Sequence, residues 1–205
     1  MAARPAREEA GTAARILDVA ERLVQVRGYN GFSYADVAAE LQITKAALHY
    51  HFAGKAELGE ALITRYAHRF TAALDALDRT APAAPARLSG YADLYLDVLR
   101  NQRMCLCGML AAEYQTLPAG MQAAVIGFLD SNEAWLEAVL DQGRRQGSLH
   151  FSGSSRDTAR MITSCLQGAM LTARPYGDIK RFQAAADNML AGLTKAAPDL
   201  QPADT

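Results

Sequence analysis

The 205-residue sequence is 50% apolar, so the chain can bury a hydrophobic core and is not expected to be disordered. Its 21 Lys and Arg residues nearly balance its 22 Asp and Glu residues, which excludes a protein that holds nucleic acid through overall positive charge. We expect a cytoplasmic protein without membrane contact, because no apolar run could span a bilayer and the segment MAARPAREEAGT lacks the apolar stretch of a secretory signal.

The spacing of apolar residues predicts an all-α fold. Ala, Leu, Met, Arg and Glu recur three and four residues apart, whereas β-branched residues are sparse and alternating runs are missing. Gly28 is expected to end the first helix, and the two prolines of the segment TAPAAPA interrupt the pattern at 80–86. The predicted helices span residues 12–27, 33–41, 44–52, 55–79, 87–103, 105–115, 119–146, 155–174 and 178–195.

Residues 32–58 carry the clearest functional pattern in the chain. Apolar side chains in this stretch can pack two short helices across a tight turn, which is the spacing of a helix-turn-helix. Ser33 and Thr44 are placed to cap the two helices, because each hydroxyl can accept from a backbone N–H of the first turn. The second helix is short and polar on its outer side, so we expect this face to enter a groove of DNA.

The stretch FSYADVAAELQITKAALHYHFAGKAEL resembles the DNA-binding domain of the tetracycline-repressor family. The resemblance extends over residues 12–65 and implies an N-terminal three-helix DNA-binding domain at 1–55. It also implies a larger C-terminal helical bundle at 56–205 for ligand binding and dimerisation. The implied DNA-binding residues are Ser33, Thr44, Lys45, Ala46, Ala47, His49, Tyr50, His51 and Lys55.

The resemblance also implies which part of the DNA each of these residues would contact. Residues 45–47 would face base edges, and Tyr50, His51 and Lys55 would contact phosphates. His49 stands where the family more usually has Tyr, which leaves its contact open. The alternative is that the segment belongs to an ordinary helical core with incidental surface histidines. We expect no metal or cofactor, since His49 and His51 are two apart on a helix and point to nearly opposite faces.

The last two predicted helices are candidates for pairing the chain with itself. One recognition helix covers few base pairs, so a two-fold homodimer is expected to present two of them to operator DNA. Two helical hairpins can form a four-helix interface through stripes of small and apolar residues. The stripes are formed by Ile162, Leu166, Ala169, Met170 and Ala173, and by Ile179, Phe182, Ala186, Met189, Leu190 and Leu193. The alternative is that both stripes serve only the core of one chain.

The middle of the chain is rich in aromatic and sulfur-containing side chains. Pockets for small apolar ligands are lined in this way, although an ordinary core has the same composition. The family resemblance implies a cavity for a small-molecule effector among these helices. The candidate effector-binding residues are Tyr91, Tyr95, Cys105, Met109, Tyr114, Trp135 and Cys165.

Three cysteines, an odd number, are expected to be free thiols. The segment CLCGMLAAE at 105–113 resembles a stretch of family members that respond to electrophiles through a cysteine, and Cys105 occupies the matching position. We therefore hypothesise that Cys105 is a reactive sensor. The alternative is that Cys105 is a small buried hydrophobic residue.

Together these patterns predict a transcriptional regulator, specifically a repressor that leaves its operator when a small molecule binds to the protein. If Cys105 is a reactive sensor, this small molecule is an electrophile. A rival interpretation is an enzyme with a cysteine nucleophile. It lacks a recognisable partner motif, since His68 and His150 are isolated, and we expect no catalytic activity. A helical interaction module without DNA binding is the third possibility.

Overall fold

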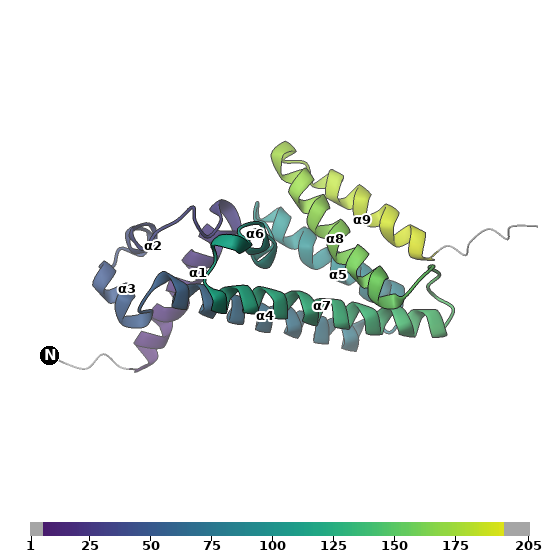
Figure 1. Cartoon of the computed structure of the whole chain (residues 1–205), viewed down its shortest axis with the longest axis horizontal. Coiled ribbons are helices and arrows are strands. Elements are labelled where there is room, and N and C mark those ends of the chain that lie inside the picture. Colours follow the sequence, from purple (N-terminus) through teal and green to yellow (C-terminus); the bar gives the residue numbers. More distant parts are fainter. Residues whose placement is uncertain (1–5, 195–205) are drawn as a thin grey trace, which may run out of the picture. The chain divides into compact units, whose positions relative to one another are not determined.

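A computed structural model of the chain describes residues 6–194, with side chains from residue 11 onward, and is shown in Figure 1. This part of the chain contains helices and no strand, which confirms the all-α fold class. Two short 3-10 turns, Tyr114–Thr116 and Arg174–Tyr176, separate longer elements. The α-helices are α1 (Ala6–Arg27), α2 (Tyr34–Leu41), α3 (Lys45–His51), α4 (Lys55–Thr80), α5 (Ala84–Arg100), α6 (Leu106–Ala112), α7 (Ala119–Arg145), α8 (Ser155–Ala173) and α9 (Ile179–Thr194).

The predicted helices match the observed ones closely, and two differences have a physical cause. Helix α5 begins at Ala84, three residues before its predicted start, because Pro85 lies in the first turn, where a missing N–H breaks no helical hydrogen bond. The predicted helix at 105–115 is the short α6 followed by the turn at 114–116. Residue 195 and the first five residues of MAARPAREEAGT lie outside the described part of the chain.

The described residues pack as two compact units. One unit comprises residues 6–73 and 100–130, and the other comprises residues 74–99 and 131–194. Helices α1, α2, α3 and α6 belong wholly to the first unit, whereas α8 and α9 belong wholly to the second. The first unit therefore holds the predicted helix-turn-helix, and the second holds the two helices predicted to pair with another subunit.

Helix α1 forms the spine of the first unit and packs against α2 and α6. Its apolar stripe is buried, as Ile16 and Ala20 have no exposed surface and Leu23 and Val24 almost none. Gly28 follows with a backbone φ of 85°, a left-handed conformation that favours glycine, and its N–H donates to the carbonyl of Val24. The predicted end of this helix at Gly28 is confirmed.

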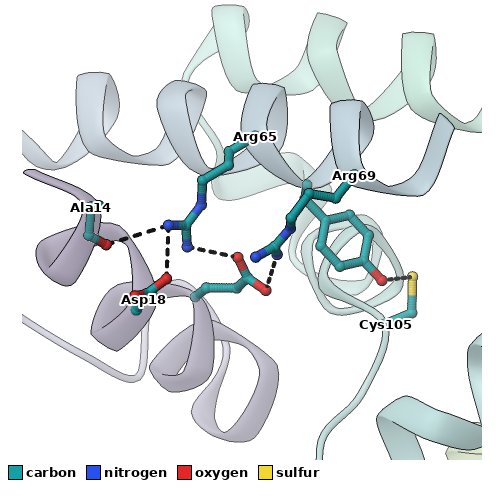
Figure 2. A network of polar contacts seen from close by, with 7 residues as sticks. Ala14, Asp18, Arg65, Arg69 and Cys105 are labelled. Carbon is teal, nitrogen blue, oxygen red and sulfur yellow. Dashed lines mark hydrogen bonds and ion pairs between the residues drawn. The ribbon is translucent and has the colours of Figure 1, made fainter. Parts of the chain in front are cut away.

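A buried carboxylate attaches α4 to α1 within the first unit. Glu21 on α1 accepts from Arg65 at 2.9 Å and from Arg69 at 2.5 Å. Figure 2 shows Arg65 reaching also to Asp18, at 2.8 Å, and to the carbonyl of Ala14. Burying an unpaired carboxylate is costly, so this double pairing fixes the position of α4 along α1.

The second unit contradicts one prediction about α8 and α9, which pack against each other. The α8 stripe predicted to meet a second subunit is wholly buried within the single chain, whereas Ile179, Met189 and Leu190 of the α9 stripe are half-buried. Leu166 and Met170 on α8 and Phe182 on α9 are each at most 1% exposed. The large apolar side chains that α8 leaves exposed are instead Met161, at 44%, and Leu171, at 62%.

Candidate nucleic-acid interface and ligand-binding region

Helices α2 and α3 form a capped helix-turn-helix. Thr44 is the N-cap of α3, and its hydroxyl oxygen accepts from the backbone N–H of Ala47 at 3.1 Å, as predicted. Ser33 is the N-cap of α2 and forms a capping box with Asp36, whose carboxylate accepts from the Ser33 hydroxyl and N–H. These hydrogen bonds lower the pKa of the Asp36 carboxyl, and the bond from the Ser33 hydroxyl has the largest effect. Both helix starts are therefore fixed locally.

Helix α3 turns one face inward and leaves the other exposed. Leu48 is fully buried and anchors α3, whereas Tyr50 is 72% exposed. Of the predicted DNA-binding residues on and beside α3, Thr44, Lys45, Ala46, His49 and Tyr50 are exposed. Ala47, His51 and Lys55 are half-buried, so they are less accessible than predicted. A contact of any of these residues with DNA stays a prediction.

His49 is held in place by an aromatic neighbour that the sequence analysis missed. The ring of Tyr34 lies 4.8 Å from the His49 ring, and the Tyr34 hydroxyl donates to the Phe52 carbonyl at 3.0 Å. The Nδ1 atom of His49 lies 3.0 Å from the Ala53 carbonyl, which can only accept, so Nδ1 carries the proton. Tyr34 and His49 line a groove of about 390 Å³ together with Lys45.

Lys55 contacts the loop between α1 and α2. Its ammonium donates to the carbonyls of Tyr29 and Phe32, each at 2.6 Å, and lies 4.4 Å from the centroid of each ring. Burial lowers the pKa of Lys55, while the charges of Glu113 and Asp36 raise it. Two of the three donors of this ammonium are thus used within the chain, and its predicted contact with phosphate stays a prediction.

The candidate effector-binding residues fall into both units. Tyr91, Tyr95, Trp135 and Cys165 belong to the second unit, and Cys105, Met109 and Tyr114 belong to the first. A cavity of about 860 Å³ in the second unit is lined by none of these seven residues. It is lined by Arg144, Gly147, Leu149, His150, Phe151, Ser152, Asp157, Thr158, Met161, Gly192 and Leu193.

Three of the candidates form an aromatic cluster in the second unit. Tyr91 stacks on Trp135 with a centroid distance of 5.7 Å, and its hydroxyl lies 3.0 Å from that of Tyr95. The indole N–H of Trp135 donates to Asp78 at 3.0 Å. Tyr91 and Tyr95 are buried, whereas Trp135 is half-buried. The cluster thus brings two phenol hydroxyls together and places a stacked indole beside them.

Cys105 is buried where α6 begins. It is the N-cap residue of α6 and is 1% exposed. Its sulfur accepts from the Tyr66 hydroxyl at 3.6 Å, and Figure 2 shows this contact as a dashed line from Cys105 to a phenol. Burial raises the pKa of Tyr66 well above its usual value, and so, to a lesser degree, does Cys105. The first unit must therefore open locally before a reagent can reach this thiol.

The other two cysteines differ from Cys105 in their surroundings. Cys107 is buried, and burial, followed by the charges of Cys105 and Glu21, raises its pKa well above the usual value. Cys165 lies half-buried on α8. All three are free cysteines, as predicted. Within residues 11–194 no group of three or more His, Cys, Asp or Glu side chains could hold a metal ion.

No helix between residues 6 and 194 combines the length and the hydropathy that crossing a membrane requires.

The chain resembles known regulatory proteins over almost its whole length. Residues 16–62 match the family of bacterial regulatory proteins called the tetR family, and residues 84–189, more than half of the chain, match the tetracyclin repressor-like C-terminal domain. The transcriptional regulator AcuR of Cereibacter sphaeroides is 26% identical over 152 residues, which are 72% of this chain and 69% of that protein.

Solved structures show the same likeness. A TetR-family transcriptional regulator from Agrobacterium tumefaciens is 32% identical, with a TM-score of 0.88 over 91% of this chain and 100% of that one. A TetR transcriptional regulator from Legionella pneumophila is 31% identical, with a TM-score of 0.81 over 94% of this chain and 100% of that one.

Tyr34 should make stability depend on pH in the alkaline range. Burial has the largest effect, followed by the charges of Glu57 and Tyr29, and together they raise the pKa of Tyr34 from 10.0 to about 12. A raised pKa means that the stabilisation is complete below about pH 10 and is lost as pH rises through 12. We expect Tyr34→Phe to lower the free energy of unfolding by about 1 kcal/mol at neutral pH, with the difference from wild type shrinking above pH 10.

Urea unfolding followed by circular dichroism across this range measures the difference. Tyr50→Phe, at an exposed position, is the control and should change the free energy of unfolding little at neutral pH. A difference between Tyr34→Phe and wild type that stays constant to pH 12 would contradict the prediction.

Proposed function

Because the chain belongs to the TetR family of bacterial DNA-binding transcriptional regulators, we propose that it is a repressor that binds operator DNA as a homodimer and dissociates when a small-molecule effector binds. The exposed face of the capped helix α3 is the observation that carries the proposal. A regulator of this kind needs no catalytic group, and we propose no enzymatic activity.

The DNA-binding role is assigned to the predicted domain at residues 1–55, and ligand binding and dimerisation to 56–205. These ranges include residues 1–5 and 195–205, which lie outside the described part of the chain. Residues 45–47 would read base edges at the start of α3, and Tyr50 and His51 would contact phosphates. The inward anchoring of Leu48 supports this assignment for Ala46 and Tyr50, which lie on the opposite face of α3 and are exposed.

The exposed face of α8 is proposed as the dimer contact. Met161, Ser164, Gly168 and Leu171 are exposed and recur three or four residues apart, so they share one face of the helix. Two large apolar side chains and two small residues on one face suit close packing against a second copy. This face replaces the stripes suggested by the sequence, which are largely buried in the chain.

The effector is proposed to be a small molecule that engages the aromatic cluster or the thiol of Cys105. The cluster offers rings for an apolar ligand and two hydroxyls for orientation. Met109, Tyr114 and Cys165 remain proposed contacts. The electrophilic version of the proposal assigns Cys105 as the group that is modified, and its hydrogen bond with Tyr66 on α4 supports a structural consequence of modification.

Lys45→Ala should weaken operator binding. Loss of one base-edge contact is expected to lower the affinity for the operator about tenfold while changing the affinity for unrelated duplex less. The operator is first isolated by selecting bound fragments of genomic DNA, and affinities are measured by fluorescence anisotropy. The matched control is Lys180→Ala on α9, also an exposed lysine. Equal loss in both variants would contradict the assignment of α3.

Leu171→Glu should separate the dimer. A charge on the proposed contact must be buried without a partner on association, so we expect a monomer in sedimentation and loss of operator binding. His68→Glu places the same charge on an exposed position of α4 and should leave the dimer intact. A Leu171→Glu protein that sediments as a dimer would remove this face from the proposal.

Alkylation should distinguish a sensor cysteine from a core cysteine. N-ethylmaleimide adds to a thiolate, and we expect its reaction with Cys105 to lower operator affinity at least tenfold. Cys105→Ser should bind the operator and no longer respond. Peptide mass spectrometry identifies the modified residue. Unchanged affinity with Cys105 modified, or modification confined to Cys165, would dismiss the electrophilic effector and leave the repressor assignment standing.

A further inference from the structure

A carboxylate from α6 holds the loop that joins α1 to α2. This loop, residues 28–33, ends at Ser33, the N-cap of the helix-turn-helix. Glu113, the residue that ends α6, accepts from the backbone N–H of Tyr29 through Oε2 at 2.5 Å. Its second oxygen, Oε1, accepts from the N–H of Asn30 at 3.2 Å. Both oxygens of one carboxylate are therefore used on consecutive backbone donors of the loop.

The backbone of the loop is shaped around this carboxylate. When one residue of a loop has a left-handed backbone conformation, the backbone N–H groups of successive residues can point toward one place. They then form a concave site that binds an anion. Gly28 supplies the left-handed conformation, with a φ of 85°. A Cβ on this residue would lie 2.8 Å from Oε1 of Glu113, so the glycine also provides the space that the carboxylate needs.

An opposite charge holds the other side of the same loop. The ammonium of Lys55, the first residue of α4, donates to the carbonyls of Tyr29 and Phe32. The N–H groups of the loop thus meet a negative charge and its carbonyls meet a positive one, which matches the polarity of the peptide groups. Asn30 adds a side-chain hydrogen bond to Thr116 at 2.7 Å. The loop has little freedom left while α6 stays in place.

The start of α6 is joined to other parts of the first unit. Cys105, its N-cap, contacts the Tyr66 hydroxyl of α4, and the N–H of Met104 donates to the carbonyl of Gln25 on α1. A seven-residue helix is short and stiff, so a shift at its start moves its end as well. Helix α6 therefore connects a buried thiol to the loop that precedes the helix-turn-helix.

We propose that Glu113 is a positioning residue for DNA binding, which fixes the loop at 28–33 and thereby the orientation of α2 and α3. The inference rests on the proposed DNA-binding function. It adds to that function a residue that touches no DNA and acts through the backbone of Tyr29 and Asn30.

Glu113→Gln is the sharpest variant, because it keeps the shape of the side chain and removes one of the two acceptors. An amide has one acceptor oxygen, and its NH₂ group would face a backbone donor. We expect about a tenfold loss of affinity for the operator duplex selected with the wild-type protein, measured by fluorescence anisotropy. Amide exchange at Tyr29 and Asn30 should become at least tenfold faster in the DNA-free protein.

One further readout and two further variants separate positioning from a direct contact or a general loss of structure. The slope of log affinity against log salt concentration should equal that of wild type, because no phosphate contact is lost. Asp130→Asn, an exposed carboxylate-to-amide change in the same unit, is the matched control and should bind like wild type. Gly28→Ala places a Cβ against the Glu113 carboxylate. It should weaken operator binding by disturbing the loop instead of the carboxylate.

The outcomes are distinguishable. The inference is overturned if Glu113→Gln binds the operator as tightly as Asp130→Asn does. It is also overturned if Ile63→Val, a change in the core of the first unit, loses as much operator affinity when its melting temperature is lowered by the same amount. A wild-type protein that selects no DNA would instead remove the proposed function. The expected result is a loss in Glu113→Gln that neither Asp130→Asn nor Ile63→Val reproduces.

Discussion

The double ion pair of Glu21 with Arg65 and Arg69 is the constraint on which the first unit depends. The Glu21 side chain is 9% exposed, and a carboxylate is costly to bury unless it is paired, so α4 can pack on α1 only where both arginines reach it. Lys55 begins α4 and holds the loop that leaves α1. The location of the helix-turn-helix thus follows from the register of two helices that do not belong to it.

Local signals in the sequence were sufficient to predict much of the fold. The three- and four-residue spacing predicts the helices, and Gly28 and Thr44 mark ends that depend on neighbours within a few residues. The inward side of α3 is predicted for the same reason, since Leu48 is the apolar residue of a polar helix. Patterns of this kind are contained in the segment itself and need no knowledge of the tertiary structure.

The candidate site was less predictable, because its geometry depends on residues far apart in the chain. The stripe on α8 shows that one face is buried and does not show whether the chain or a second copy covers it. The contacts of Lys55 with Tyr29 and of Glu113 with the same loop span 26 and 84 positions. Glu113 lies in the segment CLCGMLAAE, inside the helix predicted at 105–115, so no local signal marked it as the contact of a distant loop.

The stacking of Trp135 on Tyr91 has a spectroscopic consequence. The sequence contains one tryptophan, so the intrinsic indole emission of the whole protein arises at this position in the second unit. The indole is half-buried, stacked on a phenol ring and hydrogen-bonded to the carboxylate of Asp78. Its emission wavelength and quenching therefore report the polarity of one defined place, which gives the protein a label-free optical probe within its aromatic cluster.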